Sequence, residues 1–172
     1  TLIPSVNAAD QHSYAIYDNK GQLVGNVDAE GYLTEIRYDA NGNALSSTRY
    51  INKAKTPVSA TSTLASLRPA VHAEDQTNSQ TYDALNRVIT SINAEGTQKQ
   101  YQYDVAGNLV KVIDAAGTGD IRINNQRYDQ LGRVIATLSG LGSTQLTGNQ
   151  SQKEIDAIRA QYGPSYSYDA PG

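Results

Sequence analysis

The residues with the most regular spacing are aspartates that directly follow tyrosines. Carboxylates can work as a general acid and base when two of them are held about 5 to 10 Å apart in a cleft. These aspartates instead recur once per repeat, each followed by turn-forming residues, so we interpret them as structural. The pairs are Tyr17-Asp18, Tyr38-Asp39, Tyr82-Asp83, Tyr103-Asp104, Tyr128-Asp129 and Tyr168-Asp169.

Other residue types that could do chemistry are sparse. The two histidines, His12 and His72, have no serine or cysteine nucleophile motif near them. There is no cysteine, which excludes disulfides and thiolate metal sites. We therefore predict no catalytic residue, no metal and no cofactor.

One segment, 39–43, has the composition of the start of a calcium loop. An EF-hand needs a glutamate at the twelfth position, where this sequence has Tyr50. An Asn-Gly hairpin turn explains the same residues without an ion. The turn is the preferred interpretation.

The aspartates are expected to sit in tight turns between strands. In Asp18 to Gly21 the carboxylate can accept hydrogen bonds from backbone N–H groups of the turn, and the glycine can adopt a positive φ. Asn86 takes the glycine position after Asp83, which asparagine tolerates. The same turn is predicted at Asp39 to Gly42, Asp104 to Gly107 and Asp129 to Gly132.

Short β runs follow these turns, and second turns lead back to the next tyrosine. The runs are 23–27, 88–92, 109–113 and 134–138, and the second turns are marked by Gly31, Gly96 and Gly117. In the return run 97–103 the tyrosines alternate with glutamines, so that they share one face of a strand. Two strands of about six residues and two turns make a β-hairpin of about 21 residues.

The hairpin is repeated along the chain. Successive Tyr-Asp pairs are 21, 44, 21, 25 and 40 residues apart. The segment 28–43 also recurs in register 65 residues later. A fixed period of this kind indicates a repeat architecture. The predicted fold is all-β, with tandem antiparallel β-hairpins forming part of a curved sheet or shell.

Two segments depart from the repeat. Residues 53–80 are expected to form a loop insertion, with a helical turn at Leu64–Arg68 that Pro69 ends. In residues 150–163, Ser151 and Glu154 have the spacing of a capping box, which predicts one short amphipathic helix over 151–162. We expect this helix to cover part of the sheet; docking of a partner is the alternative. The division is then repeats 14–52, loop 53–80, repeats 81–142, helix 150–163 and a truncated repeat 164–172.

Composition favours a β-rich class without a nucleic-acid-binding face or a membrane-spanning run. All aromatic side chains are tyrosines, 12 in number, which suits half-exposed sheets. The net charge of −3 gives no basic surface for nucleic acid. No apolar run approaches the roughly 20 residues that span a membrane, and the first residues lack a signal-peptide pattern.

The pattern Tyr-Asp-x-x-Gly-x-Leu, seen in 17–23 and 103–109, resembles the YD or Rhs repeats. The resemblance covers residues 14–142 and 166–172 apart from the insertions. It implies long β-strips that wind into a hollow shell. In Rhs polymorphic toxins and in the B and C subunits of Tc toxins such shells enclose a toxic polypeptide. Related repeats occur in wall-associated bacterial proteins and animal teneurins. No segment matches the family's self-cleaving aspartates, so none is transferred.

The resemblance implies a non-catalytic wall segment of a large exported bacterial protein, secreted or at the cell surface. The lack of methionine and the last residue, Gly172 in a repeat turn, indicate a piece of something longer. The expected partners are the rest of the repeat shell and an encapsulated toxin polypeptide. The alternative is an adhesin whose tyrosine face or 53–80 loop contacts a glycan or a protein. Open strand edges also predict self-association.

Overall fold

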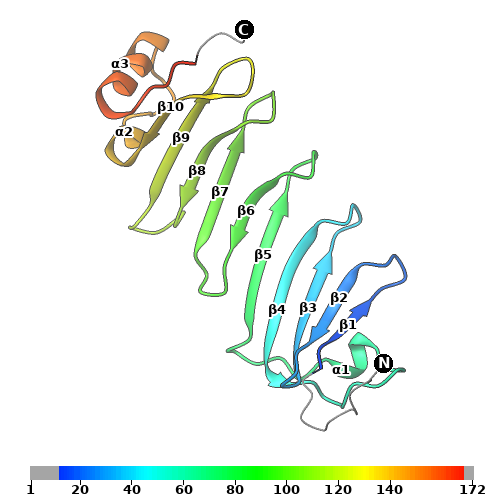
Figure 1. The fold of residues 1–172 in the computed structure, drawn as a ribbon. Coiled ribbons are helices and arrows are strands. Elements are labelled where there is room, and N and C mark those ends of the chain that lie inside the picture. The colour runs from blue at the N-terminus through cyan, green and yellow to red at the C-terminus, as the bar shows by residue number, and fades with distance from the viewer. Residues whose placement is uncertain (1–11, 169–172) are drawn as a thin grey trace, which may run out of the picture. The chain divides into compact units, whose positions relative to one another are not determined.

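The computed structural model describes residues 12–168, and the strands follow one another in the sheet in chain order (Figure 1). The described strand pairs are antiparallel, so the expected tandem hairpins are confirmed. One short helix lies between β4 and β5, and two more follow β10. The strands are β1 (Tyr14–Tyr17), β2 (Leu23–Val27), β3 (Tyr32–Tyr38), β4 (Ala44–Lys53), β5 (Gln76–Tyr82), β6 (Val88–Ile92), β7 (Gln98–Tyr103), β8 (Leu109–Asp114), β9 (Arg122–Tyr128) and β10 (Val134–Ser139). The helices are α1 (Leu64–Leu67), α2 (Gly140–Thr144) and α3 (Gln152–Tyr162).

The chain divides into two compact units, one mainly from the residues up to Gln80 and one mainly from Thr81 onward. In the first unit, β2 and β3 alternate buried and more exposed positions, as a half-covered sheet requires. Their buried face meets α1 and the loop that carries it. The resulting core consists of Val27, Leu33, Tyr50 and Leu67, with Ile16, Ala54, Val58 and Leu64 packed around it.

The insertion between β4 and β5 is shorter than the sequence indicated. β5 begins at Gln76, so the connecting loop is 54–75 rather than 53–80. The strand sequence Gln-Thr-Asn-Ser-Gln-Thr-Tyr contains no apolar alternation that could predict it. Pairing with β4 defines it instead, including hydroxyl contact of Thr48 with Thr77 at 2.9 Å. α1 lies where a helical turn was expected.

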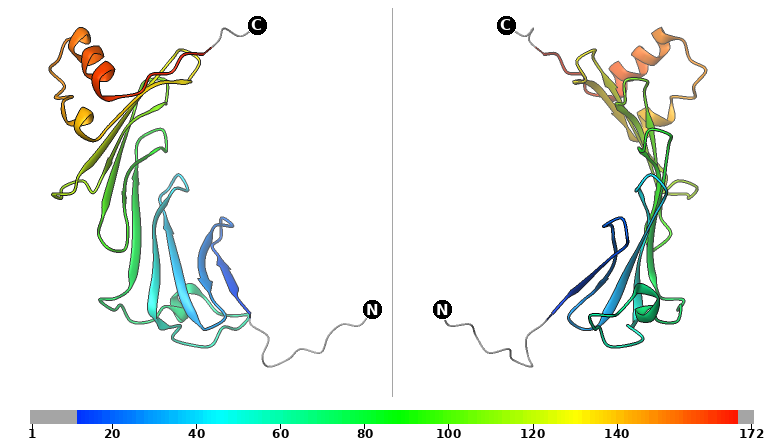
Figure 2. Two further views of the ribbon diagram at one scale, coloured as in Figure 1. Left: turned by 60° about the vertical axis from the view of Figure 1, so that its left-hand side comes forward. Right: turned by 90° about the vertical axis from the view of Figure 1, so that its right-hand side faces the viewer.

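In the second unit, α2 and α3 lie against one face of the last strands (Figure 2). α3 begins after the N-cap Ser151, whose side chain and Glu154 form a reciprocal capping box. After α3 the chain returns to β10, where Tyr166 N–H donates to the carbonyl of Ile135 at 2.8 Å. The predicted helix is therefore inserted between β10 and a segment that pairs with β10.

Helix α2 was missed because its Gly-Leu-Gly-Ser-Thr sequence is typical of a turn. β10 ends at Ser139, so repeat structure does not continue to 142 as expected. Gly142 allows close packing: a Cβ there would lie 2.5 Å from both Leu138 Cδ1 and Tyr162 Cβ. Within residues 12–168, no helix is long and apolar enough to cross a membrane.

Candidate functional site

Each repeat aspartate is bonded to its own turn. Asp104 Oδ1 accepts from the backbone N–H of Ala106 at 3.0 Å and of Asn108 at 2.8 Å. The Asp104 N–H in turn donates to the Asn108 carbonyl at 3.0 Å, and Gly107 N–H donates to the Asp104 carbonyl at 3.1 Å. The same pair of bonds to Oδ1 recurs at Asp18, Asp39, Asp83 and Asp129.

The fourth residue of the turn has a left-handed backbone. Gly107 has φ 91°, and Asn86 has φ 60° at the equivalent place. Beyond the turn one strand carries an extra residue: Tyr103 pairs with Leu109 but Gln102 pairs with Lys111. This is a β-bulge, which adds right-handed twist, and the same register shift occurs beside the turns of Asp18, Asp39 and Asp129.

These contacts lower the pKa of the repeat carboxyls. The Asn108 amide, which donates to Asp104 Oδ2 at 2.9 Å, is the main reason that the pKa of Asp104 is below its usual value. The side chain of Asn43 lowers the pKa of Asp39, and that of Arg87 lowers the pKa of Asp83. Backbone N–H donation from Arg133 is the main cause for the lowered pKa of Asp129. All four are bound as anions.

Two repeats use arginine in place of asparagine four residues after the aspartate. Arg87 Nε donates to Asp83 Oδ2 at 2.8 Å, and its guanidinium carbon lies 4.4 Å from the ring centroid of Tyr103. Arg133 repeats this with Asp129 at 2.7 Å and with the Tyr168 ring at 4.6 Å. The arginine thus joins one turn to the tyrosine of the next repeat by a cation–π contact.

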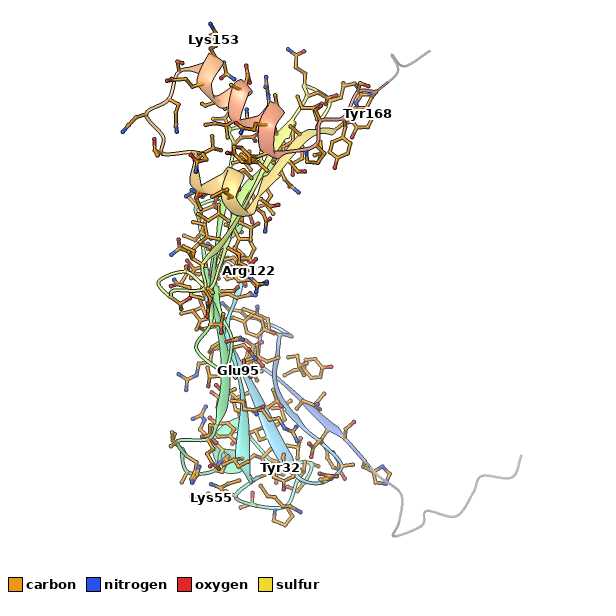
Figure 3. All side chains as sticks on the ribbon, turned by 90° about the vertical axis from the view of Figure 1, so that its left-hand side faces the viewer. Tyr32, Lys55, Glu95, Arg122, Lys153 and Tyr168 are labelled. Carbon is orange, nitrogen blue, oxygen red and sulfur yellow. The ribbon has the colours of Figure 1, made fainter. Side chains whose placement is uncertain are left out.

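The repeat tyrosines also join consecutive repeats through their hydroxyls. Each hydroxyl donates to the backbone carbonyl of the residue five positions after the aspartate of the preceding repeat. The bonds are Tyr38 to Leu23 at 3.0 Å, Tyr103 to Val88 at 2.9 Å, Tyr128 to Leu109 at 3.0 Å and Tyr168 to Val134 at 2.6 Å. Tyr168 is labelled in Figure 3; Asp169, its partner in the dipeptide, lies outside the described residues.

The remaining repeat positions differ in surroundings. Tyr17 is 61% exposed, while Tyr82 closes β5 directly before the Asp83 turn. Gly21, Gly42 and Gly132 all have positive φ, as the turns require.

A second aspartate turn lies at the opposite end of the first hairpin. Asp28 Oδ1 accepts from the N–H groups of Glu30 at 3.1 Å and Tyr32 at 2.8 Å, and Arg49 pairs with Oδ2 at 3.0 Å. Burial acts to raise the pKa of Asp28, but these donors together lower it. In the sequence this turn is marked by Gly31, and the role of Asp28 becomes visible only in the structure.

A buried carboxylate, Glu35, holds the insertion to the sheet of the first unit. Only 3% of Glu35 is exposed. Its carboxylate accepts two hydrogen bonds from Arg68, at 2.6 and 2.8 Å. Tyr50 donates to it at 2.8 Å and Arg37 at 3.1 Å. Burial tends to raise the pKa of Glu35, but these donors outweigh it and the pKa is lowered.

Sequence reasoning missed Glu35 and Arg68 because they are 33 residues apart and belong to no repeat position. The arginine partners of the turns had a signal: the position four after the aspartate is always Gln, Asn or Arg. The two histidines lie in exposed positions, and His72 Nδ1 accepts from Glu74 N–H at 3.2 Å. Among residues 12–168, no cluster of three or more histidines and carboxylates could hold a metal.

The architecture is therefore an array of β-hairpins whose recurring polar contacts lie in the turns. Residues 82–118 match the family model described as RHS Repeat. This segment begins at Tyr82, directly before the Asp83 turn, and includes Tyr103 and the Asp104 turn. The resemblance to RHS repeats is confirmed by this match over residues 82–118.

Two solved structures have a similar fold. One is described as the crystal structure of TcdB2-TccC3, with 18% identity and a TM-score of 0.55; 74% of this chain and 5% of that chain are covered. The other is TcdB2-TccC3 without its hypervariable C-terminal region, with 20% identity, a TM-score of 0.54 and the same coverage. At such identities the likeness establishes the fold, and the chain spans about 5% of the length of these proteins. No curated protein matches the sequence significantly.

Proposed function

We propose that this chain is a wall segment of a large exported Rhs-type protein, and that the parent shell encloses or helps deliver a toxic polypeptide. The observation that supports this most is the tyrosine hydroxyl, which bonds to the preceding hairpin in four repeats. Such a bond fastens each of these hairpins to the preceding one, as a continuous array of repeats requires. The likeness in fold to TcdB2-TccC3 supports assignment to a repeat array of this kind.

A non-enzymatic role agrees with the use of the carboxylates. The repeat aspartates accept backbone N–H groups on one oxygen, and in four turns the other oxygen binds the residue four positions later. Glu35 is enclosed by Arg68, Tyr50 and Arg37. These carboxylates are therefore engaged as structural acceptors, and a general base needs an available lone pair within reach of a substrate.

The test uses the complete parent protein. Protease treatment of intact particles should leave an internal polypeptide protected, and the same polypeptide should be digested after denaturation. Electron microscopy of the same sample should show a closed wall. Complete digestion of every segment outside the repeats, without denaturation, would contradict encapsulation.

A glycan array separates the wall from an adhesin. A wall segment should give no specific signal, because the half-buried tyrosines Tyr38, Tyr103 and Tyr128 hydrogen-bond to backbone carbonyls. Specific glycan binding by the parent, together with absence of protected cargo, would favour the adhesin instead.

A further inference from the structure

A polar groove lies between α3 and the part of the sheet next to it in the second unit. Its volume is about 390 Å³, and its lining includes Gln102, Lys111, Asn125, Arg127, Gln152 and Arg159. Strand register explains the grouping: Lys111 pairs with Gln102 on one side and with Asn125 on the other. Side chains of paired residues share a face of the sheet, as do Asn125 and Arg127, two apart in β9.

The helices α2 and α3 cover this face of the sheet over β10 and leave it uncovered over β7, β8 and part of β9. Ala136 and Leu138 of β10 pair with Arg127 and Asn125, and both are buried. The open side presents β7, β8 and β9 beside the stripe of α3 that contains Gln152 and Arg159. The groove therefore lies along the edge of α3, where the covered part of the sheet face meets the uncovered part.

Positive charge in the groove is only partly neutralised. Asp156 is shared by two arginines, with Oδ1 at 3.3 Å from Arg127 and 3.9 Å from Arg159. Burial lowers the pKa of Arg159, and the nearby positive charge of Arg127 lowers it further. Within residues 12–168, Lys111 makes no ion pair.

Asp104 is the other carboxylate beside the groove. It is already hydrogen-bonded to Asn108 and to two backbone N–H groups of its turn. Three cationic side chains therefore face one shared carboxylate and one that is engaged elsewhere.

We propose that this groove binds an acidic polypeptide segment, with an aspartate or glutamate carboxylate placed between Lys111, Arg127 and Arg159. Arginine forks bind carboxylates through paired N–H donors. The amide nitrogens of Asn125 and Gln152 already donate to Ser143 Oγ at 3.0 Å and to Asp156 Oδ1 at 2.8 Å. Their side-chain carbonyl oxygens can still accept hydrogen bonds from peptide N–H groups, as can that of Gln102. The binding goes beyond the wall function and does not depend on it.

Sugars and nucleic acids fit the groove less well than an acidic peptide. Sugars stack on exposed aromatic rings, but the one aromatic residue in this lining is Tyr128. Its half-buried hydroxyl already contacts the Leu109 carbonyl at 3.0 Å and Gln126 Oε1 at 2.6 Å. Nucleic acid needs an extended basic surface, and the chain has a formal charge of −3.

The experiment is an NMR titration of the 172-residue chain with the capped peptide Gly-Glu-Gly-Glu-Gly. We expect saturable shifts at the amides of Lys111, Asn125 and Arg127, and none with the Gly-Gln-Gly-Gln-Gly peptide. Lys111→Gln should weaken binding about 1.5- to 5-fold, the range for one partly exposed ion pair. Lys153→Gln is the matched control, because Lys153 lies on α3 but points away from the sheet (Figure 3).

A second variant, Gln102→Glu, places a carboxylate in the groove and should reduce binding further than Lys111→Gln. Thermal melts of all variants check that they fold. No shift at about 10 mM peptide would overturn the proposal. Equal binding of the glutamine peptide, equal weakening by Lys111→Gln and Lys153→Gln, or stronger binding of a uronic-acid oligosaccharide to the same amides would also overturn it.

Discussion

The hydroxyl of Tyr103 donates a hydrogen bond of 2.9 Å to the carbonyl of Val88, 15 residues earlier in the preceding hairpin. The guanidinium carbon of Arg87 also lies 4.4 Å from the centroid of the Tyr103 ring. One tyrosine therefore couples two successive repeats by a polar and a cation–π contact, whose contributions substitution can separate.

Tyr103→Phe removes the hydroxyl and keeps the ring, so we expect a loss of about 0.5–1.5 kcal/mol in the free energy of unfolding. Tyr103→Leu also removes the cation–π contact and should cost about 0.5–1 kcal/mol more than Tyr103→Phe. Urea denaturation followed by circular dichroism measures both. Tyr166→Phe is the control, because Tyr166 is 47% exposed in the same unit. Equal effects of the two phenylalanine variants would contradict the coupling.

The repeat carboxyls should make stability depend on acid pH. Since the turn donors lower the pKa of Asp104 below its ordinary 3.8, the ionised form stabilises the fold. This contribution is complete above the ordinary value and is lost as pH falls through the lowered value. Melting temperatures measured from pH 7 downward should stay level and then fall below about pH 4. Asp104→Asn should reduce the acid-dependent fall, whereas Asp120→Asn, outside the repeat turns, should leave it unchanged.

The Glu35–Arg68 pair should be the strongest polar anchor of the loop 54–75. Arg68→Met removes both hydrogen bonds that Arg68 donates to the Glu35 carboxylate, which is only 3% exposed. We therefore expect the free energy of unfolding to fall by about 2–3 kcal/mol. Arg37→Met removes a bond to the same carboxylate from a side chain that is 66% exposed, and should cost less than about 1 kcal/mol. Urea denaturation gives the free energies, and limited proteolysis should show faster cleavage in 54–75 for Arg68→Met alone. Similar losses in both variants would refute this ranking.

Gly142 should be essential for the helical cover of β10. Gly142→Ala puts a methyl group 2.5 Å from Leu138 Cδ1 and Tyr162 Cβ, and overpacking of this kind costs about 1–3 kcal/mol. Gly119→Ala is the control, because no atom lies within 4 Å of a Cβ built there. Hydrogen exchange of the α3 amides reports whether the cover loosens. Unchanged exchange in Gly142→Ala would disprove close packing at this contact.

The edge strand β1 should promote association of the isolated chain. Among the described strands, β1 pairs on one side only, with β2. Unpaired strand edges template pairing with other chains, and a charged side chain on the edge opposes it. We expect light scattering to show a mass that rises with concentration, and a smaller rise for Ala15→Lys. A concentration-independent monomer would exclude this edge as an association site.

The aspartate turns could be predicted from sequence because the bonds of each aspartate reach no further than four residues along the chain. Asp104, Gly107 and the Asn108 amide form a local unit, and Ser151 with Glu154 caps α3 in the same way. β5 could not be predicted because its polar sequence takes its conformation from pairing with β4. The Glu35–Arg68 pair depends on where the loop folds back, which no local pattern specifies.

The tyrosine bonds all run in one direction along the chain. In each, the acceptor carbonyl belongs to the earlier repeat and the donor hydroxyl to the later one. Because a chain is synthesised from its N-terminus, the acceptor carbonyl of each of these four bonds is made before its donor hydroxyl. In these four repeats the contact is therefore vectorial, since each tyrosine meets an equivalent carbonyl that precedes it along the chain.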